Sequence, residues 1–138
     1  MLLITEENSD VRVIPLDDSP HAPENVRSWL GDSRGHWDGD TLVVETTNFH
    51  QERKWDGAAG NLHLVERFTR VGDDTLLGEV TLTDPTTWVA PWSIEVPLPR
   101  MDYERLFEFA CHELNYGIIN VVRGARARAA EYELDSDR

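Results

Sequence analysis

The chain has 138 residues, with 26 acidic and 13 basic side chains and a net charge of −13. A field of this sign repels nucleic-acid phosphates and anionic lipid, so we expect neither a nucleic-acid partner nor a membrane. The apolar fraction of 40% and the charged fraction of 28% are typical of a globular protein. The single cysteine, Cys111, excludes an intramolecular disulfide and a multi-cysteine zinc site.

The sequence opens without a basic stretch followed by an apolar run, and no apolar run approaches the length of a membrane span. We therefore expect a cytoplasmic protein, or a secreted or periplasmic one if an N-terminal signal has been removed. The length suits one domain, and no repeat or linker divides the chain. Residues 1–138 are accordingly expected to form a single barrel-like domain that ends in a helix.

Short apolar runs at residues 1–6 and 11–16 predict two strands joined by a polar turn. A proline-rich stretch, residues 17–28, is expected to be irregular. The Asp38–Gly39 pair then stands between two extended runs, which is a strong signal for a tight hairpin.

Alternating apolar residues predict further strands at residues 61–70, 75–83 and 92–98. Prolines 97 and 99 favour an edge position for the last of these. A strand is also expected at residues 106–112. After Gly117 the apolar spacing becomes helical, and residues 135–138 are expected to be a frayed tail.

This succession predicts a mainly β protein, an antiparallel up-and-down meander with a C-terminal helix. A meander of this kind closes into a barrel or folds into a sandwich. We favour a lipocalin-like barrel, which can hold one small ligand, with a β-sandwich as the alternative.

Glu66 is the first candidate for chemistry, because it shares an alternation face with Leu62, Leu64 and Phe68. A carboxylate in apolar surroundings has a raised pKa and can act as a general acid or base. The structural alternative is an ion pair with an arginine such as Arg67 or Arg105.

His112 and His63 are the other catalytic candidates, because histidine titrates near neutral pH. His112 stands beside Glu113 at the end of an expected strand, where the two side chains point to opposite faces. His63 likewise faces away from Glu66. A metal site from His36, His63 and His112 has no recurrent ligand spacing to support it, so we expect no metal. Phosphate-loop, dinucleotide and serine-hydrolase motifs are absent, so we expect no cofactor.

Five tryptophans are the other conspicuous feature of the sequence. Trp37 and Trp92 are expected to anchor the core. Trp55 and Trp88 fall in predicted loops, where they would either cover a ligand or cap the core. The expected ligand-binding residues are Trp37, Trp55, Trp88, Trp92, Phe68, Asn115 and Tyr116.

Several stretches resemble a large group of uncharacterised bacterial proteins. Residues 28–44 resemble the group's Gly-Asp-Ser-x-Gly-x-Trp-(Glu/Asp)-Gly-Asp-Thr-Leu-Val-Val signature, and residues 63–70 and 110–117 resemble two further motifs. The resemblance implies that His112, Glu113 and Asn115 belong to the group's pattern. Relatives of this kind usually carry an export signal and additional N-terminal sequence. The resemblance implies no particular reaction.

Three functions are compatible with these features. The first is a cofactor-independent acid/base enzyme (isomerase, cyclase, dehydratase or lyase) acting on a small, largely apolar molecule, which polar residues on core-like faces favour. The second is a lipocalin-like binding protein for a small apolar or aromatic ligand, which the lack of any known catalytic motif favours. The third is an interaction module, for instance a homodimer. We expect the enzyme first.

Overall fold

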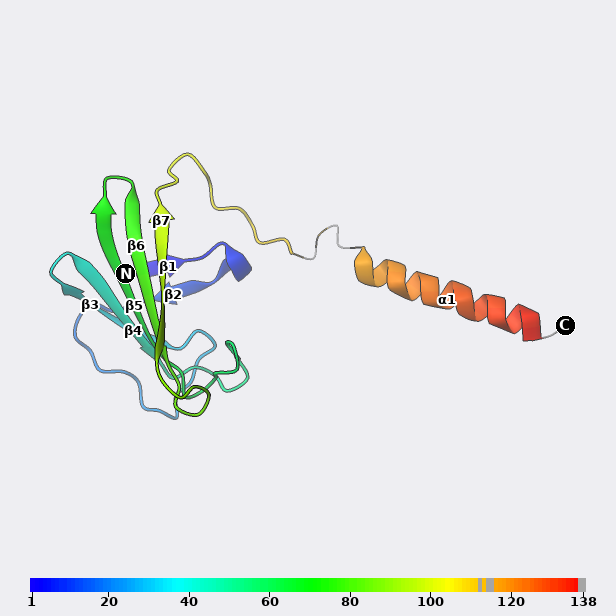
Figure 1. Cartoon of the computed structure of the whole chain (residues 1–138), viewed down its shortest axis with the longest axis horizontal. Helices are drawn as coiled ribbons and strands as arrows, with labels where there is room; N and C mark the ends of the chain where they lie inside the picture. The colour runs from blue at the N-terminus through cyan, green and yellow to red at the C-terminus, as the bar shows by residue number, and fades with distance from the viewer. Residues whose placement is uncertain (112, 114–115, 137–138) are drawn as a thin grey trace. The chain divides into compact units, whose positions relative to one another are not determined.

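The computed structural model describes residues 1–111, 113 and 116–136. Its contacts divide the chain into two units, Met1–Phe107 and Glu108–Arg138. Each unit is described by itself. The first holds all the strands and the second holds the helix (Figure 1).

The first unit contains two antiparallel sheets. A small sheet pairs β1 (Leu2–Ile4) with β2 (Val11–Val13), and a short 3₁₀ turn, Glu7–Ser9, lies between them. The larger sheet is a five-stranded meander in the order β3-β4-β5-β6-β7. Its strands are β3 (Asp32–Asp38), β4 (Thr41–Thr47), β5 (His63–Gly72), β6 (Thr75–Thr83) and β7 (Trp92–Pro99).

The predicted antiparallel meander is confirmed, but in the described residues the sheet is open rather than a closed barrel. Its edge strands, β3 and β7, do not pair with each other. The outer edge of β3 is covered by the chain that follows β2, since Gly35 N–H donates to the Pro15 carbonyl at 2.9 Å and Arg34 Nε donates to the Ser19 carbonyl at 3.1 Å. Pro97 and Pro99 lack the N–H groups that another strand would need. These features block closure at both edges.

Local turn chemistry explains the hairpins. Gly39 has a φ of +60° in the two-residue connection between β3 and β4, which suits a residue without a Cβ. Gly35 is required for a different reason. A Cβ at this position would lie 2.8 Å from Ile14 Cγ2 and 2.7 Å from Leu16 Cδ2, so only glycine lets this segment pack against β3.

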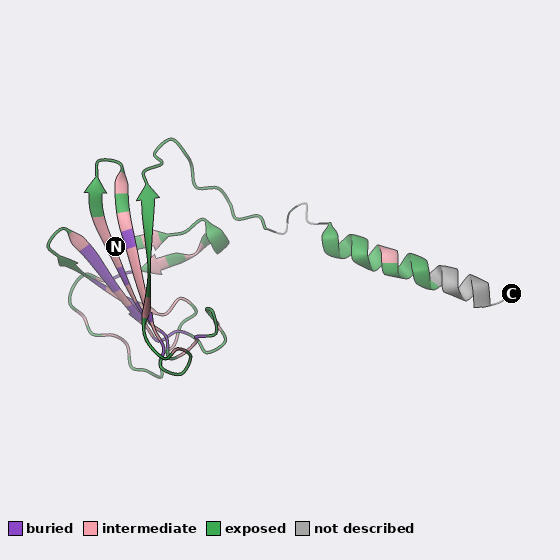
Figure 2. Ribbon diagram, in the orientation of Figure 1, coloured by how far each residue is buried: buried purple, intermediate pink, exposed green. Residues whose placement is uncertain are grey.

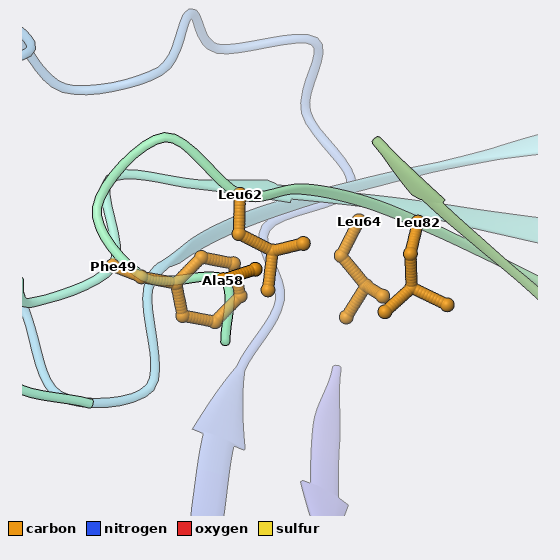
Figure 3. Packing of buried hydrophobic residues seen from close by; sticks show 5 residues of the cluster. All are labelled: Phe49, Ala58, Leu62, Leu64 and Leu82. Carbon is orange, nitrogen blue, oxygen red and sulfur yellow. The ribbon is translucent and has the colours of Figure 1, made fainter. Parts of the chain in front are cut away.

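The core lies on one face of the large sheet. This inner face carries Leu42, Val44, Leu64, Glu66 and Leu82, as the register of β4, β5 and β6 requires. One cluster of buried residues joins it to the loops (Figure 3): Phe49, Ala58, Leu62, Leu64 and Leu82. A second cluster contains Ile14, Leu42 and Val44, with Leu3 and Phe68 packed against it. Leu3 and Ile14 thereby bring the N-terminal segment over the inner face.

Two expectations about the chain beyond β7 are wrong. Residues 106–110 form no strand, and Phe107 and Phe109 are exposed. Alternation predicts this strand, but within the described residues no strand pairs with it. The expected tail is also wrong at residues 135 and 136, because α1 spans Gly117–Ser136, and residues 137 and 138 lie outside the described residues. The described residues of α1 are mostly exposed up to residue 129 (Figure 2). Within the described chain, no helix has the length and apolarity needed to cross a membrane.

Candidate functional site

A cleft of about 1030 Å³ opens in the first unit between the β1–β2 hairpin, the inner face and the loops that precede β3 and β5. Its apolar wall combines residues from all three: Leu3, Leu30, Phe49, Leu62, Leu64 and Val80. Leu62 and Leu64 belong to the buried cluster of Figure 3, where their side chains project to the same side of the chain. The cleft therefore rests on the core.

A charged pair lies in this apolar wall. Glu66 is only 9% exposed, and its strand neighbours Val44 and Val80 are apolar. Arg12, from β2, binds both carboxylate oxygens of Glu66, with Nη1–Oε2 at 2.6 Å and Nη2–Oε1 at 2.8 Å. Arg12 Nη1 also lies 3.5 Å from the hydroxyl of the buried Thr46. A bidentate pair of this kind balances the charge that β5 carries into the cleft.

The Arg12–Glu66 pair also ties the hairpin to the sheet, because its two residues lie on β2 and β5. Sequence reasoning placed Glu66 inward, which the structure confirms, and offered an arginine as its structural partner. The partner is Arg12, whereas Arg67 pairs with Asp38. Arg12 was missed because its neighbours Val11 and Val13 suggest that the valine face of this strand points into the core and that Arg12 points into solvent. Both valines are exposed, and Arg12 is the residue that points inward.

Two tryptophans line the mouth of the cleft. Trp29 and Trp55 are 54% and 43% exposed. Arg53 lies over the Trp29 ring, with its guanidinium carbon 5.9 Å from the ring centroid. Trp55 is held by a two-residue turn at Asp56–Gly57, both with positive φ, and by paired backbone hydrogen bonds with Ala58. The prediction that Trp55 lies in a loop is confirmed, and it borders a cleft.

Trp88 and Trp92 lie in the core rather than at the cleft. Their rings meet edge to face, with centroids 5.3 Å apart, and both pack against the cluster that contains Leu82. Asp84 shapes the loop before Trp88, because its carboxylate accepts hydrogen bonds from Thr86 and Thr87. These bonds hold the pKa of Asp84 below its ordinary value, and the Thr86 hydroxyl has the largest effect.

The remaining predicted ligand-binding residues are scattered. Trp92 anchors the core as expected, but Trp37 does not, because it lies near the β3–β4 turn and is 62% exposed. Phe68 packs against the cluster of Ile14, Leu42 and Val44. Tyr116 is an exposed residue of the second unit. His112 and Asn115 lie outside the described residues.

His63 lies on the outer face of the sheet, which carries Asp32, Arg34, Glu45 and His63. Its Nε2 makes a short hydrogen bond with Glu45 Oε1. The structure therefore confirms that His63 and Glu66 face opposite ways and does not bring these two catalytic candidates together. His36 is an exposed residue of β3.

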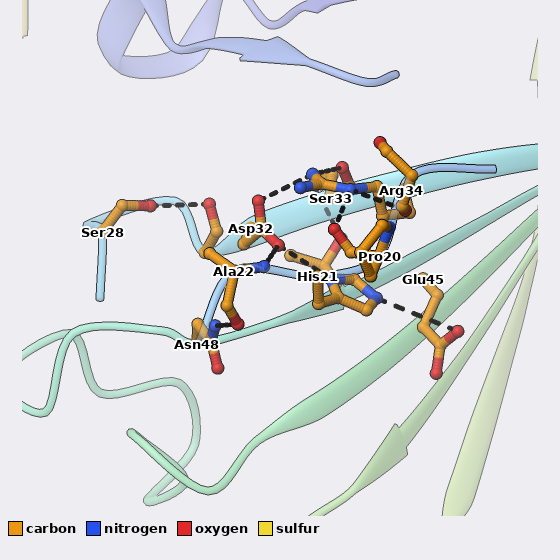
Figure 4. Close-up of polar contacts among 12 residues, drawn as sticks. Pro20, His21, Ala22, Ser28, Asp32, Ser33, Arg34, Glu45 and Asn48 are labelled. Carbon is orange, nitrogen blue, oxygen red and sulfur yellow. Dashed lines mark hydrogen bonds and ion pairs between the residues drawn. The ribbon is translucent and has the colours of Figure 1, made fainter. Parts of the chain in front are cut away.

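The outer face holds a polar network of its own (Figure 4). His21 Nδ1 lies 2.9 Å from Asp32 Oδ2, and His21 Nε2 lies 4.0 Å from Glu45 Oε2. Burial alone would raise the pKa of Asp32, but hydrogen bonds from the Ala22 N–H, the His21 ring and Arg34 outweigh it and lower that pKa. The network fastens the proline-rich stretch to β3 and β4.

The described residues contain no preformed metal site. In the part of the chain that the structure describes, no group of three or more histidine, cysteine, aspartate or glutamate side chains is arranged to hold an ion.

Comparison of the chain with protein-family profiles, with curated proteins and with solved structures gave no match.

Proposed function

We propose that the first unit is a binding protein for a small, largely apolar molecule, held in the cleft between the β1–β2 hairpin and the inner face. The supporting observation is the cleft itself, about 1030 Å³ in size and walled by Leu62, Leu64 and Val80. Small-molecule pockets typically measure about 300–1,000 Å³ and combine an apolar lining with a few polar groups. This mode is lipocalin-like in placing a ligand against an antiparallel sheet.

The tryptophans at the mouth support an aromatic or flat apolar ligand. Trp29 and Trp55 each bring a large apolar ring to the cleft while part of the ring remains in solvent. A ligand that covered them would remove this apolar surface from water, which is the main source of affinity for such molecules.

Titration of the full chain with N-phenyl-1-naphthylamine, an uncharged dye that fluoresces in apolar surroundings, tests the proposal. We expect saturable binding that the Trp29→Ala/Trp55→Ala variant weakens by about tenfold, equivalent to about 1.4 kcal/mol. Trp37→Ala is the matched control, because Trp37 is also an exposed tryptophan but lies near the β3–β4 turn. Absence of saturable binding, or an equal loss in the control, would contradict the proposal.

A proton-transfer reaction on the bound molecule is our second candidate, because the carboxylate of Glu66 lines the cleft. We place it second for two reasons. Arg12 occupies both oxygens of Glu66, and His63 is on the opposite face. Incubating the protein with small ketones in D₂O would reveal such chemistry as deuterium incorporation next to the carbonyl, followed by NMR. Exchange that Glu66→Gln abolishes would favour the enzyme over the binding protein.

A further inference from the structure

We infer that the cleft selects an uncharged amphiphile whose head group carries a hydrogen-bond donor beside an acceptor, as a primary amide does. This inference rests on the proposed binding function and names the class of ligand. It follows from the Arg12–Glu66 pair, which is the polar feature within the apolar wall.

The pair keeps hydrogen-bonding capacity that its protein partners do not use. A guanidinium has five N–H donors, and the described residues account for three of those of Arg12: two to Glu66 and one to Thr46. Each oxygen of Glu66 accepts one of these bonds and retains a further lone pair. Both side chains line the cleft and are still 15% and 12% exposed. A ligand therefore meets a donor and an acceptor side by side.

An anionic head group does not suit this arrangement. The positive charge of Arg12 is already balanced by Glu66, so a second carboxylate would enter without a counter-charge. The other charged residues of the lining are three acidic ones, Glu7, Asp10 and Glu52, and two basic ones, Arg53 and Lys54. They add no excess of positive charge that could bind an anion. The net charge of −13 on the chain adds a repulsive field.

A cationic head group is disfavoured by Arg12. Both oxygens of Glu66 are bound by its guanidinium, so a second cation would lie beside a like charge in apolar surroundings. Glu7 and Glu52 are exposed, and exposed ion pairs contribute little affinity in water. Asp10 is half-buried and already lies 4.0 Å from the guanidinium of Arg53. An uncharged head group avoids both costs, and an amide matches the donor and acceptor that the pair leaves open.

Displacement of bound N-phenyl-1-naphthylamine by four compounds with the same eight-carbon chain and different head groups tests this inference. We expect octanamide to displace the dye at concentrations about tenfold lower than octanoate or octylammonium at pH 7.5. Methyl octanoate, which is uncharged but only accepts hydrogen bonds, should be about fivefold weaker than octanamide. If octanoate or octylammonium displaced the dye at the same concentration as octanamide, the inference would be overturned, whereas the binding of the dye would still support the proposed function. Failure of the dye to bind would overturn both.

A double variant tests whether the Arg12–Glu66 pair causes the preference for the amide. Arg12→Met/Glu66→Leu replaces both polar partners with apolar side chains, and we expect octanamide to lose its advantage over methyl octanoate. Glu45→Gln/His63→Gln, which alters the pair on the outer face, is the matched control and should keep the ranking of the native protein. Retention of the amide preference in the first variant would overturn the assignment. If that variant does not fold, the ranking measured on the native protein decides.

Discussion

Glu66 and Glu45 lie on adjacent strands, and each pairs with a cationic or protonatable side chain, but on opposite faces of one sheet. The Glu66 side chain is 12% exposed and is bound by both nitrogens of the Arg12 fork. The Glu45 side chain is 46% exposed and meets His63 through one hydrogen bond. The same kind of carboxylate therefore has a different energetic role on each face.

Burial accounts for this difference. On the inner face, desolvation makes each charge depend on its partner, and removal of one partner leaves an uncompensated charge in apolar surroundings. On the outer face, water can take over the role of a lost partner, so an exposed pair contributes little. The comparison implies that polar residues near the cleft are coupled to the stability of the unit, whereas those of the outer face are nearly independent of it.

Arg12→Met gives the largest expected effect. It leaves Glu66 without its partner, and we expect the free energy of unfolding to fall by about 3 kcal/mol at neutral pH, the lower end for a buried pair because a little of each side chain is exposed. Urea unfolding followed by tryptophan fluorescence measures this loss.

The double variant Arg12→Met/Glu66→Leu is the control for this prediction. Replacing both members of a buried pair with apolar residues is often close to neutral, so most of the lost stability should return. A double variant as unstable as Arg12→Met alone would mean that the two residues are not coupled.

Asp32→Asn should have a smaller effect, about 1–2 kcal/mol, because it weakens charge-assisted hydrogen bonds at a side chain that is 21% exposed. The effect should depend on pH. The folded-state pKa of Asp32 lies below its ordinary value, so its stabilisation is present above about pH 4 and is lost as the pH falls through the folded-state pKa.

Free energies of unfolding measured from pH 7 to pH 2.5 test this direction of the pH dependence. The difference in stability between the native protein and Asp32→Asn should shrink toward low pH. Asp84 also has a lowered pKa, but it is present in both proteins and cancels from the difference. A difference that stays constant over this range would show that ionisation of Asp32 does not contribute.

Much of the sheet could be predicted from the sequence because its signals are local. Alternation in residues 61–70 and 75–83, together with a polar turn, gives both strands and the face on which Glu66 lies. The Asp38–Gly39 pair gives the β3–β4 hairpin in the same way. Each of these features depends on residues only a few positions apart.

The rest of the site depends on contacts that local patterns do not encode. Arg12 and Glu66 are 54 positions apart, and the pattern of β2 suggests the opposite orientation. Trp37 was expected to anchor the core, but nothing in the local sequence shows that this end of β3 is exposed. Residues 106–110 alternate as a strand does but have no partner strand. The periodicity of a strand predicts which residues share a face of the sheet. Which face is buried, and which strands pair, depends on contacts across the whole fold.

His63→Gln gives the smallest expected effect, below about 1 kcal/mol, because the pair that it forms with Glu45 is exposed. Binding of N-phenyl-1-naphthylamine should be unchanged, since His63 faces away from the cleft, whereas its chain neighbours Leu62 and Leu64 line it. Urea unfolding and dye titration on the same sample measure both quantities. A loss of stability as large as that of Arg12→Met would contradict the energetic distinction between the two faces. A large loss of dye binding would show instead that the outer-face network controls the cleft through β5.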